Sequence, residues 1–333
     1  MGIREQTRSD HKDSLDGSAS SAMKNISSLV SVVIPSFNHA RYLKLAIESI
    51  LNQNYKHVEC FVIDGLSSDG TLEILKSYGN KIRWVSEADR GQVDAINKGF
   101  KLTQGEIFTW LNADDQWRTP DAVSKAVKFL NQHQDVAVVY GLSRDLDEAG
   151  KDVGETYSHA WDLAYSVEFC DHCIPQSASF MRRSAFEKVG MLDERFRQRF
   201  DHDLWLRIGL NEKIKQIPEV LALTSNQKGV TFTSGVESSC VEIIKKFYTL
   251  PGISEMLLKK KKRALSNAYL RGIQYSWQRN HDFVQMLKGV VGAVGSDVTN
   301  VPRIVLTFLR FVSLLAKLVS DRIGQSFKYD NKH

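Results

Sequence analysis

Two adjacent carboxylates, Asp114 and Asp115, directly follow the apolar run Ile107–Leu111. Like charges placed side by side repel each other unless a cation or a proton relieves them. Mg²⁺ and Mn²⁺ suit such a pair, because they take one or two carboxylates and complete their coordination with phosphate oxygens and water. The pair therefore indicates a site for a metal ion and a diphosphate, and a solvated turn rich in aspartate is the alternative interpretation.

The segments that must position this pair alternate between two patterns. Continuous apolar runs predict buried strands, and apolar residues at helical spacing predict helices between them. We expect strands at 29–34, 58–63, 82–85, 107–111 and 136–140, and helices at 42–54, 71–78, 93–102 and 122–130. This alternation is typical of an α/β fold with a parallel sheet and helices on both faces.

Polar residues follow the first four of these strands. They are Pro35, Ser36 and Asn38 after the first strand, Asp64 after the second, Asp89 after the third, and Asn112 with the acidic pair after the fourth. Ligands of parallel sheets bind outside the carboxyl ends of the strands, so we expect these side chains to line one site. Asp64 is placed to accept hydrogen bonds from a base or a ribose, whereas Asp89 either reaches the ribose or sugar or belongs to a turn.

The regular alternation ends after Tyr140. Residues 142–156 predict a hairpin or a loop, and helices are expected at 184–189 and 201–210. From residue 236 onward the pattern is helical. We expect the polar residues 1–28, which lack the apolar segment of a signal peptide, to form a disordered leader.

The charge of the chain is concentrated at its end. Residues 241–333 carry 16 Lys and Arg against 6 Asp and Glu, a net +10, whereas the whole chain carries +5. An acidic body with a basic tail indicates a catalytic domain that meets an anionic surface, either a membrane or a nucleic acid. The Leu and Phe content of residues 301–323 argues against nucleic acid.

Residues 301–323 are apolar apart from a few polar and basic positions, among them Arg303, Arg310 and Lys317 at intervals of seven. The cations interrupt the stretch too often for a bilayer span. It fits a helix that lies in a membrane interface with its cations toward lipid headgroups, or a helix packed in the core or in a dimer.

Four cysteines in a chain of 333 residues do not make a disulfide framework. Cys170 and Cys173 have the spacing of a zinc motif, but no second pair of Cys or His lies nearby in the sequence. We expect reduced, partly buried thiols in a cytoplasmic protein.

Several short motifs occur in one order along the chain. They are Pro35–Asn38, Asp64–Thr71, Ser86–Gln92, Leu111–Asp115, Ile174–Gln176 and Asp201–Arg207. Together they resemble family 2 glycosyltransferases. The resemblance implies a GT-A fold, with a mostly parallel Rossmann-like sheet flanked by helices, an acceptor-binding half and a helical C-terminal extension. We expect the nucleotide-binding half at 29–141, the acceptor half at 142–235 and a helical basic extension, with membrane association as one interpretation of it, at 236–333.

The resemblance also implies an activity. It is the inverting transfer of a hexose from a nucleotide-sugar donor, a UDP-sugar, to a glycan or lipid-linked acceptor in cell-surface polysaccharide biosynthesis. The donor would contact Pro35, Ser36, Asn38, Asp64, Asp89, Asn112 and Asp114, and Mn²⁺ or Mg²⁺ would bind Asp114 and Asp115. Such an enzyme would act at the inner face of the cytoplasmic membrane, with residues 301–323 as its peripheral contact and no nucleic-acid partner.

Inverting transfer needs a base that deprotonates the acceptor hydroxyl. The resemblance assigns this role to Asp201, for which a helix N-cap is the alternative. Gln176 and His172 would lie in the acceptor or sugar pocket, with a structural histidine as the alternative interpretation of His172. Asp203 and Arg207 are four residues apart on one helical face, so we expect them to pair.

Three positions depart from the common pattern of the family. Asn112 stands where an Asp is frequent, Gly65 replaces a second Asp, and Phe200 replaces a Glu before the base.

Two other functions compete with the transfer of a sugar. A sugar-nucleotide nucleotidyltransferase would need a Gly-rich phosphate loop with a basic residue after the first strand, and a non-catalytic nucleotide-sugar-binding scaffold would need neither the acidic pair nor the base.

Overall fold

The computed structural model describes residues 28–147, 149–155, 158–225, 236–280, 283–307 and 309. The expected disordered leader, apart from Ser28, lies outside the described residues, as do Arg310 and Lys317 of the predicted basic stripe.

The first half of the sheet is parallel and confirms the predicted α/β fold. Its strands are β1 (Val30–Ser36), β2 (Val58–Asp64), β3 (Arg83–Ser86) and β4 (Ile107–Trp110), in the order β3-β2-β1-β4. All seven residues of β1 are buried, which explains why the strand reads as a continuous apolar run rather than an alternating one.

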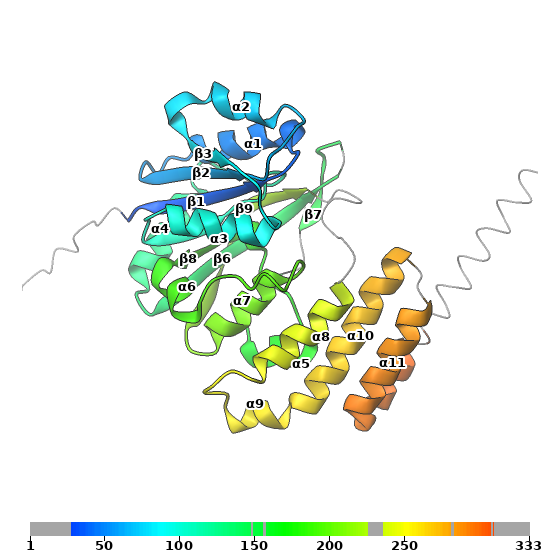
Figure 1. The fold of residues 1–333 in the computed structure, drawn as a ribbon. Helices are drawn as coiled ribbons and strands as arrows, with labels where there is room; N and C mark the ends of the chain where they lie inside the picture. The colour runs from blue at the N-terminus through cyan, green and yellow to red at the C-terminus, as the bar shows by residue number, and fades with distance from the viewer. Residues whose placement is uncertain are drawn as a thin grey trace, which may run out of the picture.

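Helices cover both faces of this half (Figure 1). Its helical segments are α1 (Ala40–Leu51), α2 (Thr71–Ser77), the 3₁₀ turn η1 (Gly79–Lys81), α3 (Gln92–Leu102) and α4 (Ala122–Gln132). The alternation of side chains along β1 separates two cores: Val33 packs with Ile96 and Phe100 of α3, whereas Val32 and Ile34 pack with α1, α2 and α4.

The second half of the sheet mixes directions. Its strands are β5 (Gln116–Trp117), β6 (Val136–Leu146), β7 (Asp152–Glu155), β8 (Ser179–Arg182) and β9 (Lys213–Ser225). Strand β8 runs antiparallel between β4 and β6, while β6 and β9 pair in parallel and β5 runs antiparallel to β9. Strands β6 and β7 form a hairpin, which was one of the two alternatives for residues 142–156.

The helical segments of this half are α5 (Leu163–Phe169), the 3₁₀ turn η2 (Gln176–Ala178), α6 (Arg183–Val189) and α7 (Phe200–Gly209). Helix α7 is buried from Phe200 through Ile208. The ring of Trp205 stacks on Trp110 at the end of β4, with ring centroids 6.2 Å apart and planes inclined by 10°. This stacking fixes the start of α7 close to the carboxyl end of a central strand.

The C-terminal part is helical, as its pattern predicts, and lies at one end of the sheet (Figure 1). Its segments are α8 (Val236–Phe247), α9 (Glu255–Lys259), α10 (Lys261–Asn280), α11 (Phe283–Ser296) and the 3₁₀ turn η3 (Val298–Asn300), followed by helical residues 301–307. Helix α8 packs on α7 and α10, and α10 packs on α5 and α11. In the described part of the chain, no helix has both the length and the apolar character that crossing a bilayer demands.

Arg303 is the member of the predicted lipid-facing stripe that the structure describes, and it contacts protein. Its Nη1 atom donates to Oδ1 of Asn267 over 3.0 Å, and its guanidinium lies 4.6 Å from the centre of the Phe169 ring. This residue therefore ties residues 301–307 to α10 and to the end of α5.

Candidate active site

The loops that follow β1 and β2 are joined at the carboxyl edge of the sheet. The backbone N–H of Asn38 donates to Oγ of Ser67 over 2.7 Å, and the N–H of Ser68 donates to Oδ1 of Asn38 over 2.9 Å. Asn38 has φ of 56°, a left-handed conformation that asparagine tolerates better than most residues. Asn38 therefore holds the two loops in one arrangement.

Asp64 is fully buried at the end of β2. Its carboxylate accepts hydrogen bonds from the N–H of Ser67 at 3.0 Å, from Oγ of Ser67 at 2.5 Å and from Oγ of Ser86 at 2.6 Å. These bonds tie the ends of β2 and β3 together. A contact between Asp64 and a base or ribose stays a prediction.

Asp89 occupies the space beside Gly65. A Cβ atom built on Gly65 would lie 2.7 Å from Oδ2 of Asp89, and Oδ1 of Asp89 accepts from the N–H of Gly91 over 2.8 Å. The carboxylate of Asp89 thus lies where a side chain at position 65 would begin. This explains why the chain has glycine where the family often has a second aspartate.

Ser36 ends β1, one residue after Pro35, and both are buried. The Oγ atom of Ser36 has no hydrogen-bond partner among the described residues. A buried hydroxyl left without a partner costs roughly 1–3 kcal/mol. Ser36 therefore places a buried, unpaired hydroxyl at the edge where a donor is expected.

Asp115 of the acidic pair is held by two neighbours, Asn112 and Ser225. Asn112 accepts from Nε2 of Gln92 over 2.6 Å and donates from its Nδ2 to Oδ2 of Asp115 over 3.1 Å. The backbone N–H of Ser225, the last residue of β9, donates to Oδ1 of Asp115 over 3.1 Å. The carboxylate of Asp115 is therefore anchored on both oxygens.

Both acids have pKa values above the ordinary one. Burial raises the pKa of Asp115 well above its usual range, the charge of Asp114 and that of Asp145 raise it further, and the bonds from Ser225 and Asn112 only partly oppose them. Burial also raises the pKa of Asp114, against the opposing charge of His39. Within the described residues, the charge of His39 does not offset burial and the repulsion between the two acids, and their oxygen ligands are those that Mg²⁺ and Mn²⁺ prefer.

Sequence reasoning did not assign His39, Asp145 or Ser225 to this site. His39 directly follows Asn38 in the first loop, so its place at the edge was visible in the order of motifs. Asp145 and Ser225 gave no such signal, because β6 and β9 bring them to the acidic pair from distant parts of the chain; Ser225 lies 110 positions from Asp115.

Asp201 lies in the first turn of α7, but Arg199 is the N-cap residue of that helix. The capping alternative for Asp201 is therefore wrong. The Oδ1 atom of Asp201 accepts from the N–H of His202 over 2.9 Å, and its Oδ2 atom lies 2.8 Å from Nε2 of His172. Two of the predicted site residues, Asp201 and His172, thus form one pair.

The pKa of Asp201 is below its ordinary value. Burial raises the pKa of this carboxyl, but the charge and the hydrogen bond of His172, together with Arg199 and the N–H of His202, outweigh that effect. Beside it, burial lowers the pKa of His202 well below its usual range, and the charges of Arg199, His172 and Arg271 add to this. An ionised Asp201 consequently lies next to a neutral His202.

Phe200 belongs to the core, with its ring 6.2 Å from that of Trp110. The position at which the family often has a glutamate is therefore used for packing here. Gln176 donates from Nε2 to the carbonyl oxygen of Trp110 over 2.6 Å, so it braces the strand end from which Asn112 and the acidic pair follow. Among the described residues, no hydrogen bond or ion pair links the Asp201–His172 pair to the acidic pair.

The predicted pairing of Asp203 with Arg207 is confirmed, with Oδ2 and Nε 2.9 Å apart and both side chains buried. The four cysteines are free and buried, as expected. Cys170 and Cys173 do not converge on one site. The Sγ atom of Cys170 lies 3.9 Å from the carbonyl oxygen of Cys240, and burial raises the pKa of Cys173 to about 12.

Comparison with known proteins agrees with this arrangement. The sequence family described as "Glycosyl transferase family 2" matches residues 31–190. An uncharacterized glycosyltransferase of Rickettsia typhi is 34% identical over 191 residues, which cover 54% of this chain and 58% of the relative. A PGL/p-HBAD biosynthesis glycosyltransferase of Mycobacterium bovis is 26% identical, over 75% of this chain and 98% of the relative.

Among solved structures, residues 1–349 of TarS from S. aureus in complex with UDP-GlcNAc superpose with a TM-score of 0.62 and 16% identity. The superposition covers 80% of this chain and 81% of that one. At this identity the likeness establishes the fold, which is the GT-A arrangement that the motifs imply. The chain spans less than two thirds of the length of the Rickettsia relative.

Proposed function

We propose that the chain is an inverting glycosyltransferase of family 2, the family that matches residues 31–190, and that it moves a sugar from a nucleotide-sugar donor to a glycan or lipid-linked acceptor. The observation that carries the proposal is the pair formed by half-buried Asp114 and buried Asp115 at the carboxyl edge of the sheet, both with raised pKa values. A negatively charged pair with raised pKa values is costly without a cation, and a metal–diphosphate ligand would supply one.

The proposed donor is a UDP-sugar. The TarS structure that shares this fold contains UDP-GlcNAc, and the unpaired hydroxyl of Ser36 and the carboxylate of Asp89 lie on loops at the same edge as the acidic pair. Asn38 and Asp64 would contribute mainly by holding the loops after β1 and β2, because their polar atoms are occupied by Ser67, Ser68 and Ser86.

The proposed metal ligands are Asp114 and Asp115, with Mn²⁺ or Mg²⁺ as the ion. Asp115 already accepts from two protein donors, so Asp114, which is half-buried and bonded to no other described side chain, is the more accessible ligand. When bound, the ion supplies positive charge that stabilises the departing nucleoside diphosphate.

The proposed base is Asp201 acting together with His172. Nε2 of His172 faces Asp201 at 2.8 Å, and the imidazole side chain is 30% exposed whereas the carboxylate is 12% exposed. With the Nε2 proton held by Asp201, the Nδ1 atom is left to accept a proton from an acceptor hydroxyl, as in other Asp–His pairs. Asp201 keeps the imidazole oriented and stabilises the cation that forms.

We also propose a peripheral position on the inner face of the cytoplasmic membrane, where lipid-linked acceptors are exposed. Arg303 does not support this position, because it contacts Asn267 and Phe169. The support comes from α11 and the residues after it, which expose several aliphatic side chains: Val284, Leu287, Val291, Val298, Val301, Val305, Leu306 and Leu309. Such a run is typical of a helix that contacts lipid or a partner.

Nucleotide release from a panel of UDP-, GDP- and dTDP-sugars, with and without Mn²⁺, tests the transferase proposal. We expect one nucleotide class to be released in the presence of Mn²⁺ and release to stop when EDTA is added. A nucleotidyltransferase would instead produce pyrophosphate from a nucleoside triphosphate and a sugar phosphate. A scaffold would bind the donor without turning it over.

A further inference from the structure

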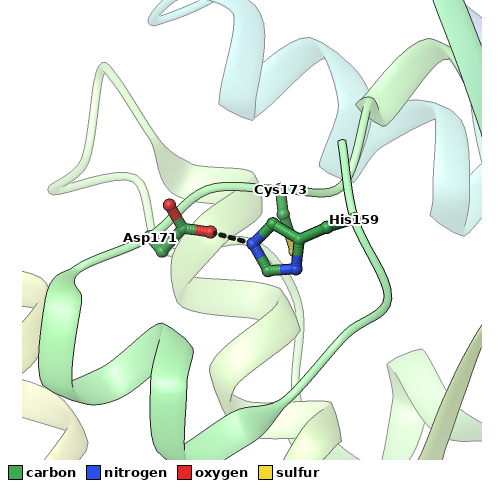
Figure 2. A group of neighbouring side chains, drawn as sticks. All are labelled: His159, Asp171 and Cys173. Atoms are coloured by element: carbon green, nitrogen blue, oxygen red, sulfur yellow. Dashed lines mark hydrogen bonds and ion pairs between the residues drawn. The ribbon is translucent and has the colours of Figure 1, made fainter. Parts of the chain in front are cut away.

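Three side chains outside the proposed donor and base sites converge beside α5: His159, Asp171 and Cys173 (Figure 2). Each offers one atom of a type that binds metal ions, and the three atoms lie within 4.8 Å of one another. Asp171 and Cys173 are buried, and the side chain of His159 is 34% exposed. Nε2 of His159 lies 2.8 Å from Oδ2 of Asp171.

The surrounding contacts orient these atoms. Nδ1 of His159 lies 2.8 Å from the carbonyl oxygen of Ala160, and the hydroxyl of Tyr140 donates to the carbonyl oxygen of His159 over 2.6 Å. The second carboxylate oxygen of Asp171 lies 3.5 Å from Nη2 of Arg271. Metal-binding histidines commonly donate their other ring N–H to a carbonyl, and metal-binding carboxylates are themselves hydrogen-bonded. The cluster has both features. With the other polar atoms of the two side chains engaged in this way, Nε2 of His159 and Oδ2 of Asp171 face each other.

We propose that His159, Asp171 and Cys173 bind one Zn²⁺ ion. Imidazole nitrogen, carboxylate oxygen and thiolate sulfur are the three ligand types that proteins offer to zinc. Mg²⁺ and Mn²⁺ favour oxygen ligands, so this site differs in kind from the acidic pair. Cys173 binds as the thiolate, and its proton is released to solvent on binding.

A cavity of about 660 Å³ reaches the cluster at His159, whereas Asp171 and Cys173 are not part of its lining. Its lining includes His159, Ala160, Tyr165 and Lys260. An ion can therefore reach the exposed edge of His159, and a water molecule from the cavity can complete the four ligands of zinc.

The cluster does not use the motif that the sequence shows. Cys170 begins the CxxC spacing, but its Sγ atom faces the carbonyl oxygen of Cys240. Asp171 and Cys173 instead flank His172, whose ring reaches Asp201. A zinc ion on the two flanking residues holds the segment that carries His172. The binding of zinc itself does not depend on the proposed transferase activity.

The test measures metal binding by the full chain. The protein is stripped with EDTA, reloaded with Zn²⁺, desalted and analysed for zinc per chain, and a parallel sample is loaded with Co²⁺ for absorption spectroscopy. We expect one tightly bound zinc and a thiolate-to-cobalt charge-transfer band. Cys173→Ser should abolish that band and lower zinc affinity by at least the roughly 10- to 100-fold that loss of an outer-shell partner costs. His159→Gln should lower zinc affinity in the same way.

Cys170→Ser is the matched control, since it removes a buried thiol from the same segment, and it should keep the zinc and the cobalt band. Full zinc binding by Cys173→Ser would overturn the proposal. So would a wild-type protein that binds Co²⁺ without a thiolate band, which is a result that needs no variant to fold.

Discussion

The Nε2 atom of His172 lies 2.8 Å from the Oδ2 atom of Asp201, so a side chain of the segment after α5 and a side chain of the first turn of α7 form one hydrogen-bonded pair. The second oxygen of Asp201 is held by the backbone of its own helix. Because both oxygens are bonded and the pKa of Asp201 is lowered, the carboxylate is better suited to orient an imidazole than to take a proton alone.

The first prediction concerns this pair. Asp201→Asn and His172→Gln should each lower the transfer rate at saturating donor by roughly 10²–10⁴, the usual contribution of a general base. Donor affinity should be nearly unchanged in both. Single-turnover rates and calorimetric donor titration measure the two quantities. If His172→Gln kept full turnover while Asp201→Asn lost it, Asp201 would act as the base by itself.

The second prediction concerns the metal ligands. Asp114→Ala should abolish the Mn²⁺-dependent part of donor binding without unfolding the protein, because Asp114 is half-buried and bonded to no other described side chain. Asp135→Ala is the control, since Asp135 is an exposed acid paired with Lys213. Calorimetry with and without Mn²⁺ measures the effect. Unchanged Mn²⁺ dependence in Asp114→Ala would remove this residue from the proposed site.

The third prediction concerns Gly65 and Asp89. Gly65→Ala should destabilise the loops by about 1 kcal/mol, the low end of the cost of overpacking, because the new Cβ would lie 2.7 Å from Oδ2 of Asp89 and that side chain must move aside and give up its bond to Gly91. The double variant Gly65→Ala, Asp89→Ala should recover most of that stability, since the clashing atoms are gone. Urea unfolding of the wild type, the two single variants and the double variant gives the coupling free energy between positions 65 and 89. Free energies of unfolding that simply add would contradict the proposed clash.

A fourth prediction follows from Asp193, which joins the segment between α6 and α7 to α8. The bond from Arg195 and that from Lys246 of α8 hold the pKa of Asp193 well below its ordinary value, although burial acts in the opposite direction. A lowered folded-state pKa stabilises the fold above the unfolded value of about 3.9, and this contribution disappears as the pH falls through the folded pKa.

Asp193→Asn should therefore cost about 1 kcal/mol at pH 7, because Arg195 is exposed and its pairing is screened. The difference from wild type should shrink as the pH is lowered below about 4. Thermal or urea unfolding across this pH range measures it. A difference that stayed constant down to the lowest pH would show that the charge of Asp193 is not responsible.

The fifth prediction concerns the exposed aliphatic residues of the C-terminal helices. Val291→Glu and Val298→Glu should each weaken binding to anionic vesicles by roughly tenfold or more, since a buried valine contributes about 1.5 kcal/mol or more. Val153→Glu on β7 is the control, as Val153 is similarly exposed but lies outside this surface. Vesicle co-sedimentation at low salt measures binding. If the wild type does not bind such vesicles, these residues do not contact lipid and the membrane proposal fails.

The strand–helix alternation could be read from the sequence because β1, β2 and β4 run parallel inside the sheet and are mostly buried and apolar. Helices α1, α3 and α4 were found to within a few residues because each buries one apolar face, α1 and α4 against one core and α3 against the other. The antiparallel insertion of β8 between β4 and β6 could not be derived. Its four residues have no distinctive period, and only tertiary pairing places them.

The residues of the candidate site could be predicted from the sequence where they directly follow a strand. The contacts between distant segments of the chain could not. The order of motifs placed Asn38, Asp64 and Asn112 at one edge of the sheet. It did not reveal that the oxygens of Asp64 are occupied by serines, nor that His172 bonds to Asp201. Those contacts depend on how loops fold over the sheet, which no local pattern encodes.

The hydrogen bond between Ser225 and Asp115 determines where the chain can be joined to a relative in a chimaera. The family match ends at residue 190, but the N–H that anchors Asp115 belongs to the last residue of β9. A chimaera joined at residue 190 would replace the strand that holds Asp115, a proposed metal ligand, whereas a junction after Ser225 would keep the strand that anchors it. Exchange of acceptor specificity between relatives should therefore be attempted by replacing loops within β6–β9, not by cutting at the end of the family match.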